Sequence, residues 1–136
     1  METTDFPFDR TKLETLEYES LIPLYELRLQ EEADDIPAIY WLGHAYTRVG
    51  RCEDGLSMDL RLSRLMPDDP TVQYNLGCSF ALTGRADEAF ETLSRAVSLG
   101  YRDVELLIAD ADLDSIRDDD RFGELLGRLR DPTGSE

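Results

Sequence analysis

The feature that most constrains this chain is an internal repeat with a period of 34 residues. Two stretches, LGHAYTRVGRCEDG starting at Leu42 and LGCSFALTGRADEA starting at Leu76, align when the sequence is shifted by 34 positions. The same shift aligns Gly43 with Gly77. Chance rarely produces so many matches at one offset, and a period of about 20–50 residues is typical of stacked-repeat architectures.

Each repeat unit has the pattern of two helices separated by a glycine. Apolar residues recur every three or four positions from Pro37 to Val49, as one face of a helix requires. Gly50 is expected to end this helix, because glycine adopts the left-handed cap conformation without steric cost. A second helix is expected over Cys52–Leu65. The second unit repeats this plan over Thr71–Thr83, Gly84 and Ala86–Leu99.

Prolines mark the boundary between the units. Pro67 follows the second helix, and proline cannot continue a helix because it lacks the backbone N–H. Pro70 is expected at the first position of the next helix, with Asp69 as its N-cap. The sequence therefore predicts one antiparallel helix pair in each unit.

The repeated glycines predict a close contact within each pair. Gly43 and Gly77 fall in the middle of a helix, where glycine costs about 0.5–1 kcal/mol relative to alanine. Twelve residues later stand Gly55 and Ala89, in the middle of the partner helix. In an antiparallel pair these positions face each other, so the two backbones can approach closely.

The repeated positions resemble the tetratricopeptide repeat, whose period is 34 residues and whose core is L-G-x-x-Y. The resemblance implies an all-α fold, a right-handed α-α superhelix built from antiparallel helix hairpins. Departures occur where the family usually has tryptophan, at Ile39 and Gln73, and where Gly100 replaces the closing proline. The positions that carry the resemblance are Leu42, Gly43, Tyr46, Gly50, Gly55 and Pro67, and then Leu76, Gly77, Phe80, Gly84, Ala89 and Ala96.

One helical domain is expected over residues 11–130. Pro23 should kink the N-terminal capping helix or begin a second segment of it. The expected parts are a capping helix over 11–33, repeat one over 36–69, repeat two over 70–103, and a C-terminal capping half-repeat over 104–130. Residues 1–10 are expected to be irregular and residues 131–136 to be frayed.

Charge and hydropathy exclude several classes of partner. The chain has 14 basic and 30 acidic residues, a net charge of −16, so nucleic-acid binding is not expected. No run of about 20 apolar residues is present, and no N-terminal basic segment precedes an apolar one, so a cytoplasmic protein without a membrane span is expected. The acidic surface favours a monomer or weak dimer. It fits either a basic partner or a simple solvated face.

The cluster of aspartates near the C-terminus resembles a calcium loop only in part. Asp110, Asp112 and Asp114 occupy its first, third and fifth positions. The loop also needs glycine at position six and glutamate at position twelve, and here these are Ser115 and Arg121. We therefore expect helix caps rather than a metal site, and we expect no cofactor.

Enzymatic activity is not expected. The repeat places His44 and Cys78 at equivalent positions of successive helices, so a Cys–His pair remains a remote alternative. However, the sequence offers no evident oxyanion hole, and it contains neither a P-loop nor a dinucleotide-binding motif.

The resemblance instead implies a binding groove on the first helix of each unit, and hence a non-enzymatic protein–protein interaction module of the adaptor or co-chaperone kind. Some members of the family clamp a C-terminal carboxylate with lysines, arginines and asparagines, and only Asn75 matches that pattern here, so an apolar or basic segment is expected rather than an acidic one. The alternative is a structural or homo-oligomeric protein whose groove holds its own N-terminal helix. The implied groove residues are Tyr40, Trp41, His44, Thr47 and Arg48, and then Tyr74, Asn75, Cys78 and Leu82.

Overall fold

The described residues of the computed structural model, 10–130, are all-helical. Residues 1–9 and 131–136, for which irregular and frayed chain is expected, lie outside this range. Within it, no helix combines the length and apolar character that a membrane crossing needs. The elements are α1 (Arg10–Glu31), α2 (Ile36–Arg48), α3 (Cys52–Leu65), α4 (Pro70–Leu82), α5 (Ala86–Ser98), α6 (Val104–Ala109), the 3-10 helix η2 (Ala111–Ile116) and α7 (Asp120–Arg130).

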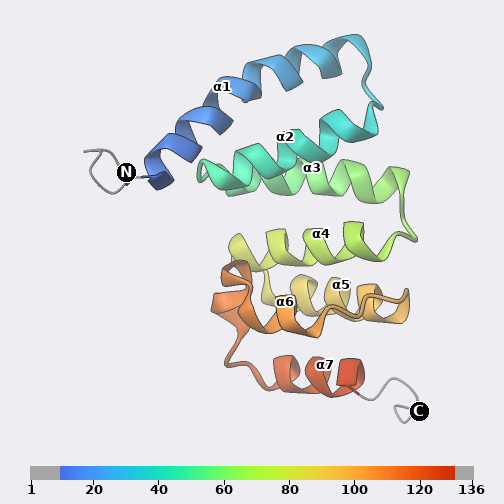
Figure 1. Ribbon diagram of the computed structural model, residues 1–136. Helices are drawn as coiled ribbons and strands as arrows, with labels where there is room; N and C mark the ends of the chain where they lie inside the picture. The colour runs from blue at the N-terminus through green and yellow to red at the C-terminus, as the bar shows by residue number, and fades with distance from the viewer. Residues whose placement is uncertain (1–9, 131–136) are drawn as a thin grey trace, which may run out of the picture.

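The helices stack in the order of the chain, from α1 at one end to α7 at the other (Figure 1). Successive long helices run in opposite directions, and α2 packs on α3 as α4 packs on α5. The helix α3 also contacts α4, so the two pairs form one continuous stack. This arrangement places α2 and α4, the first helices of the two pairs, in successive layers.

Capping residues explain where the paired helices begin and end. Asp69 accepts hydrogen bonds from the backbone N–H groups of Thr71 at 2.9 Å and Val72 at 3.1 Å, and Pro70 follows it in the first turn. Gly50 and Gly84 have φ angles of 89° and 78°, a conformation that other residues rarely adopt. The sequence signals therefore act locally, within one residue of the observed boundaries.

The mid-helix glycines lie where the paired helices come closest. A Cβ atom added at Gly43 would lie 3.0 Å from Met58 Cβ, and one added at Gly55 would lie 3.2 Å from the Gly43 carbonyl oxygen. A Cβ at Gly77 would lie 2.7 Å from Leu93 Cγ. A larger residue would push the helices apart, which accounts for glycine despite its low helix propensity.

The core consists of two clusters, one centred on α2 and the other on α4, α5 and the C-terminal helices. Ile39 is fully buried in the first cluster. Gln73, at the equivalent position of the second unit, is also buried, and its amide donates to Ser63 Oγ at 2.9 Å and to the Pro67 carbonyl at 3.1 Å. Both positions are therefore buried, and the glutamine is accommodated because its polar group is satisfied.

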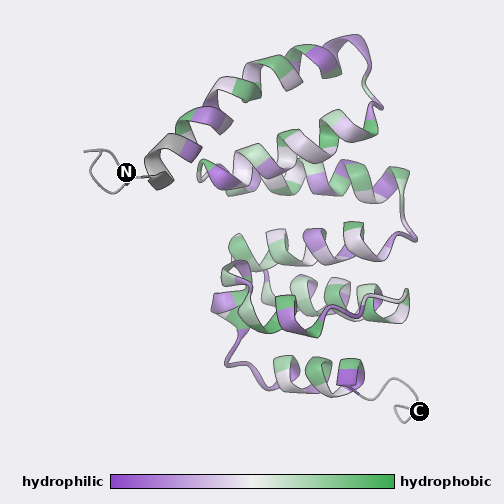
Figure 2. Ribbon diagram, in the orientation of Figure 1, coloured by the Kyte–Doolittle hydropathy of each residue, from purple (hydrophilic) through white to green (hydrophobic). Residues whose placement is uncertain are grey.

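The N-terminal helix α1 is continuous through Pro23, so the expected second segment does not form. Hydrophobic residues recur along α1 (Figure 2), and they fall into a buried set and an exposed set. The buried set packs on α2 through Ile22 and Leu29, with Tyr18 and Tyr25 beside them. The exposed set has its largest exposed fractions at Leu16 (58%), Leu24 (61%) and Leu27 (55%).

Candidate functional site

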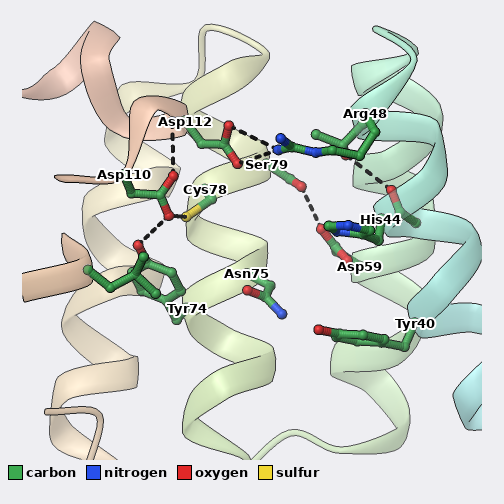
Figure 3. A pocket seen from close by; sticks show the side chains of 13 residues that line it. Tyr40, His44, Arg48, Asp59, Tyr74, Asn75, Cys78, Ser79, Asp110 and Asp112 are labelled. Atoms are coloured by element: carbon green, nitrogen blue, oxygen red, sulfur yellow. Dashed lines mark hydrogen bonds and ion pairs between the residues drawn. The ribbon is translucent and has the colours of Figure 1, made fainter. Parts of the chain in front are cut away.

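A cavity of about 300 Å³ lies between α2, α4 and the segment that joins α6 to η2 (Figure 3). The helix α3 closes it from behind through one residue, Asp59. Polar and aromatic side chains line most of the surface. The lining residues are Tyr40, Gly43, His44, Thr47 and Arg48 of α2, Asp59 of α3, Tyr74, Asn75, Cys78 and Ser79 of α4, and Leu106, Asp110 and Asp112.

Seven of the nine groove residues that the sequence suggests line this single cavity. The two that do not are Leu82 and Trp41. Trp41 is 46% exposed, and its ring contacts Tyr40 and His44 edge-on, with centroids 4.9 and 5.8 Å away. No described residue of α1 is among the lining residues. The N-terminal helix therefore leaves this cavity open.

Asp59 is the most unusual residue of the site. Its carboxylate accepts a hydrogen bond from Ser79 Oγ at 2.5 Å. No cationic side chain among the described residues pairs with it. Burial therefore raises the pKa of Asp59 to about 7, although the hydrogen bond from Ser79 acts in the opposite direction.

The opposite wall is held by Asp110. The Tyr74 hydroxyl donates to Asp110 Oδ2 at 2.6 Å, and Cys78 Sγ lies 3.8 Å from the same oxygen. The other oxygen, Oδ1, accepts from the backbone N–H of Asp112 at 3.0 Å and so caps η2. The Tyr74 ring stacks on that of Tyr101, with centroids 4.4 Å apart. This wall is therefore fixed by both hydrogen bonds and stacking.

The wall formed by α2 carries the only guanidinium of the site. Arg48 pairs with Asp112, with 3.5 Å between the nitrogen and the carboxylate. His44 lies beside it, and the Tyr18 hydroxyl is 3.3 Å from His44 Nε2. Burial and the nearby Arg48 charge lower the pKa of His44, which favours a neutral imidazole.

Two polar side chains of the cavity have unused hydrogen-bonding capacity. Asn75 and the Tyr40 hydroxyl form no hydrogen bond with any described residue, and both extend into the space between the walls (Figure 3). A ligand could therefore accept or donate hydrogen bonds here without displacing an internal contact.

The surroundings of Cys78 do not suit a nucleophilic thiol. Burial and the Asp110 charge raise the pKa of the Cys78 thiol, whereas a nucleophilic cysteine needs a lowered one. In the part of the chain that the structure describes, no group of three or more His, Cys, Asp or Glu side chains is placed to hold a metal ion. What remains is a polar cavity in which three carboxylates face one guanidinium.

A scan of the sequence against protein-family models found no match. A search of curated proteins found no relative that passes the significance threshold.

Besides Gly43, five residues that line the cavity are not among the groove positions that the sequence implies. Sequence reasoning considered Asp110 and Asp112 only as helix caps, and the structure gives them a second position on the cavity wall. Asp59 was missed because it lies on the second helix of its unit, away from the implied groove positions. One signal could have identified it: a shift of 34 places Asp59 opposite Leu93, a carboxylate against a core leucine. The other two missed residues are Ser79 and Leu106.

Proposed function

We propose that this chain is a non-enzymatic interaction module of the tetratricopeptide type, and that the cavity between α2 and α4 binds a segment of another protein. One observation carries the proposal. Equivalent positions of two successive units, such as Tyr40 with Tyr74 and His44 with Cys78, meet on the walls of the same cavity. An open surface shared by successive repeats is how stacked-repeat proteins bind extended partners.

The size and polarity of the cavity indicate the kind of segment. A volume of about 300 Å³ is at the low end for ligand pockets, and it suits one or two side chains of an extended peptide. Tyr40 and Asn75 offer hydrogen bonds to such a peptide. The carboxylates disfavour an acidic segment, so an apolar or basic one fits better.

Peptide selection on the intact chain tests this proposal. A library of random peptides is displayed against the full-length protein, and binders are measured by calorimetry. We expect Tyr40→Ala combined with Asn75→Ala to weaken the selected peptides at least tenfold, because both side chains face the cavity.

Leu65→Ala is the control, since Leu65 is an exposed apolar residue at the end of α3 that does not line the cavity. It should leave binding within about twofold, and circular dichroism should give the same helicity for every variant. Selection of no peptide, or binding lost in the control and kept in the double variant, would contradict the proposal.

A second candidate function, self-association, is favoured by the open leucine face of α1. Leu16, Leu24 and Leu27 lie on one side of this helix, and exposed apolar patches often mark protein contacts. The second copy would be the occupant, with two α1 helices packing against each other. Light scattering at rising concentration should then give a dimer mass that Leu24→Glu with Leu27→Glu converts to a monomer. A monomer at every concentration would eliminate this candidate.

A further inference from the structure

The two units differ at a repeat position that is apolar and buried in the second unit. Leu93 on α5 is 1% exposed, and the residue 34 positions earlier is Asp59. The hydrogen-bond partner of Asp59 is Ser79, and 34 positions after Ser79 stands Leu113, which is fully buried. Leu93 and Leu113 belong to the same core cluster. Two core leucines between the second helix pair and the C-terminal segment thus correspond to an aspartate and a serine between the first helix pair and the second.

The presence of Asp59 and Ser79 in place of two leucines is expected to lower the stability of the packing between α3 and α4. A carboxylate without a cationic partner loses hydration when it is partly buried, and a single hydrogen bond from Ser79 restores only part of it. Residues that conflict with the packing of their own repeat are expected at functional sites, where stability is given up for binding. Asp59 lines the cavity, whereas Leu93 packs in the second core cluster.

We propose that the cavity binds the positively charged side chain of a lysine or arginine on the partner segment, with Asp59 as its main counter-ion. This inference rests on the proposed function and specifies the chemistry of the partner. A cation is the group that an unpaired, partly buried carboxylate lacks, and charge-assisted hydrogen bonds are strongest where water is scarce.

The surroundings of Asp59 complete such a site. Asp110 adds a second carboxylate from the opposite wall, and the Tyr40 and Asn75 oxygen atoms are available as acceptors (Figure 3). The charge of Arg48 is already balanced by Asp112 at 3.5 Å, so it does not cancel the charge of Asp59. An anionic ligand would meet three carboxylates in this space, and its binding is disfavoured.

Binding of a cation at Asp59 should depend on pH, because Asp59 must be ionised to pair with the cation. The cation pairs with ionised Asp59, whose pKa is raised to about 7 in the free protein, so binding releases a proton near neutral pH. Affinity should therefore rise as the pH increases from 6 to 8 and level off above that. The titratable and charged groups that share the cavity are His44 and Arg48 of α2, Tyr74 and Cys78 of α4, and Asp110 and Asp112 beyond α6.

Titration of the neighbouring groups Cys78, Tyr74 and His44 is expected to differ from that of Asp59. Burial raises the pKa values of Cys78 and Tyr74, so both stay protonated in this range. Burial lowers the pKa of His44, so His44 loses its proton at a lower pH than Asp59 does. Comparison with the Asp59→Asn variant gives the part of the pH dependence of affinity that comes from Asp59.

The experiment compares two small probes that differ mainly in charge. N-acetyl-arginine amide and N-acetyl-citrulline amide are titrated into the intact chain at pH 8, and binding is followed by NMR shifts of the Tyr40 and Asn75 amide groups. Citrulline has nearly the shape of arginine without its charge. We expect the arginine probe to bind about tenfold more tightly or better, as a charge-assisted hydrogen bond implies.

Two variants complete the design. Asp59→Asn keeps an acceptor for Ser79 and removes the charge, so it should abolish both the arginine preference and the rise in affinity between pH 6 and 8. Asp118→Asn removes an exposed carboxylate outside the cavity and should leave both unchanged. Circular dichroism verifies that each variant is folded.

The outcomes separate this inference from the proposed function. Equal binding of the two probes, or an arginine preference that survives Asp59→Asn, overturns the cation site even if neutral peptides still bind in the cavity. An arginine preference that depends on Asp59 supports the cation site, even if library selection yields no peptide and the proposed function fails.

Discussion

The two helix pairs of this chain, α2–α3 and α4–α5, share a backbone plan and differ in what fills it. In both, a glycine at the crossing lets the helices approach, Gly43 near Gly55 and Gly77 near Leu93. In α4–α5 the space beside the crossing holds a core leucine, whereas in α2–α3 the same repeat position holds Asp59. Most residues that repeat therefore specify packing, whereas most of the cavity lining differs between the units, with Tyr40 and Tyr74 as the repeated exception.

The largest effect should come from filling a shared packing position. Gly77→Leu places a side chain where a Cβ atom alone would be 2.7 Å from Leu93 Cγ, so we expect a loss of about 3 kcal/mol or more in the free energy of unfolding. Urea denaturation measures it. The control is Gly123→Ala, because Gly123 lies in α7 with no atom near its missing Cβ, and alanine there should add about 0.5–1 kcal/mol. An unchanged stability in Gly77→Leu would refute the close-contact account.

The next effect concerns the position where the pairs differ. The pKa of Asp59 is about 7 when folded and near 3.8 when unfolded, so its contribution to stability is full below pH 3.8 and is lost as the pH rises to 7. Between pH 5 and pH 8 this loss is about 3 kcal/mol. Urea denaturation at both pH values should show that Asp59→Asn removes this part of the pH dependence. The same pH dependence in the variant would mean that the Asp59 pKa is not raised.

A smaller effect on stability should distinguish the two tyrosines at equivalent repeat positions, Tyr40 and Tyr74. Tyr74→Phe loses the hydrogen bond to Asp110 at 2.6 Å and leaves that carboxylate short of a donor, so we expect a loss of about 1–3 kcal/mol. Tyr40→Phe, at the equivalent repeat position, should be nearly neutral, because the Tyr40 hydroxyl has no hydrogen-bond partner among the described residues. Thermal unfolding of the two variants side by side decides the point. Equal losses would show that the tyrosines play the same role in both pairs.

The smallest effect is expected at the outer edge of the cavity. Arg48→Leu introduces the residue found 34 positions later, at Leu82, and removes the ion pair with Asp112. An exposed pair at 3.5 Å contributes little, so stability should change by no more than about 0.5 kcal/mol. Chemical denaturation at low and high salt tests this. A loss well above that value would make the pair a structural link between α2 and η2.

The fold could be predicted from the sequence because its signals are local. Asp69 and Pro70 favour a helix start at this point of the chain, and Gly50 ends a helix because few other residues adopt its φ of 89°. The observed α3, Cys52–Leu65, has the predicted boundaries. The helix α1, Arg10–Glu31, agrees with the capping helix expected over 11–33. The sequence leaves open whether Pro23 kinks this helix or begins a second segment, because packing against a neighbouring helix can keep a helix continuous past a proline.

The site could be predicted only in part, because half of it comes from elements distant in sequence. Positions on one face of α2 and α4 follow from helical periodicity, which places Tyr40 and His44 together but turns Trp41 away. Asp110 reaches the cavity because η2 folds back beside α4, a long-range contact with no local signal. Asp59 lies outside the groove positions of the repeat, and its role depends on its surroundings rather than on its own helix.

The most direct test of this account replaces the hydrogen-bonded pair Asp59 and Ser79 with apolar residues. Asp59→Leu introduces the residue of the second pair, and Ser79→Ala removes the hydroxyl that would lose its acceptor. We predict that urea denaturation of this double variant at pH 8 gives a free energy of unfolding higher by about 1–4 kcal/mol, as found when buried polar groups are replaced by apolar ones. The variant should also lose its preference for the arginine probe. A lower stability would contradict the account, because Asp59 and Ser79 would then hold the stack together.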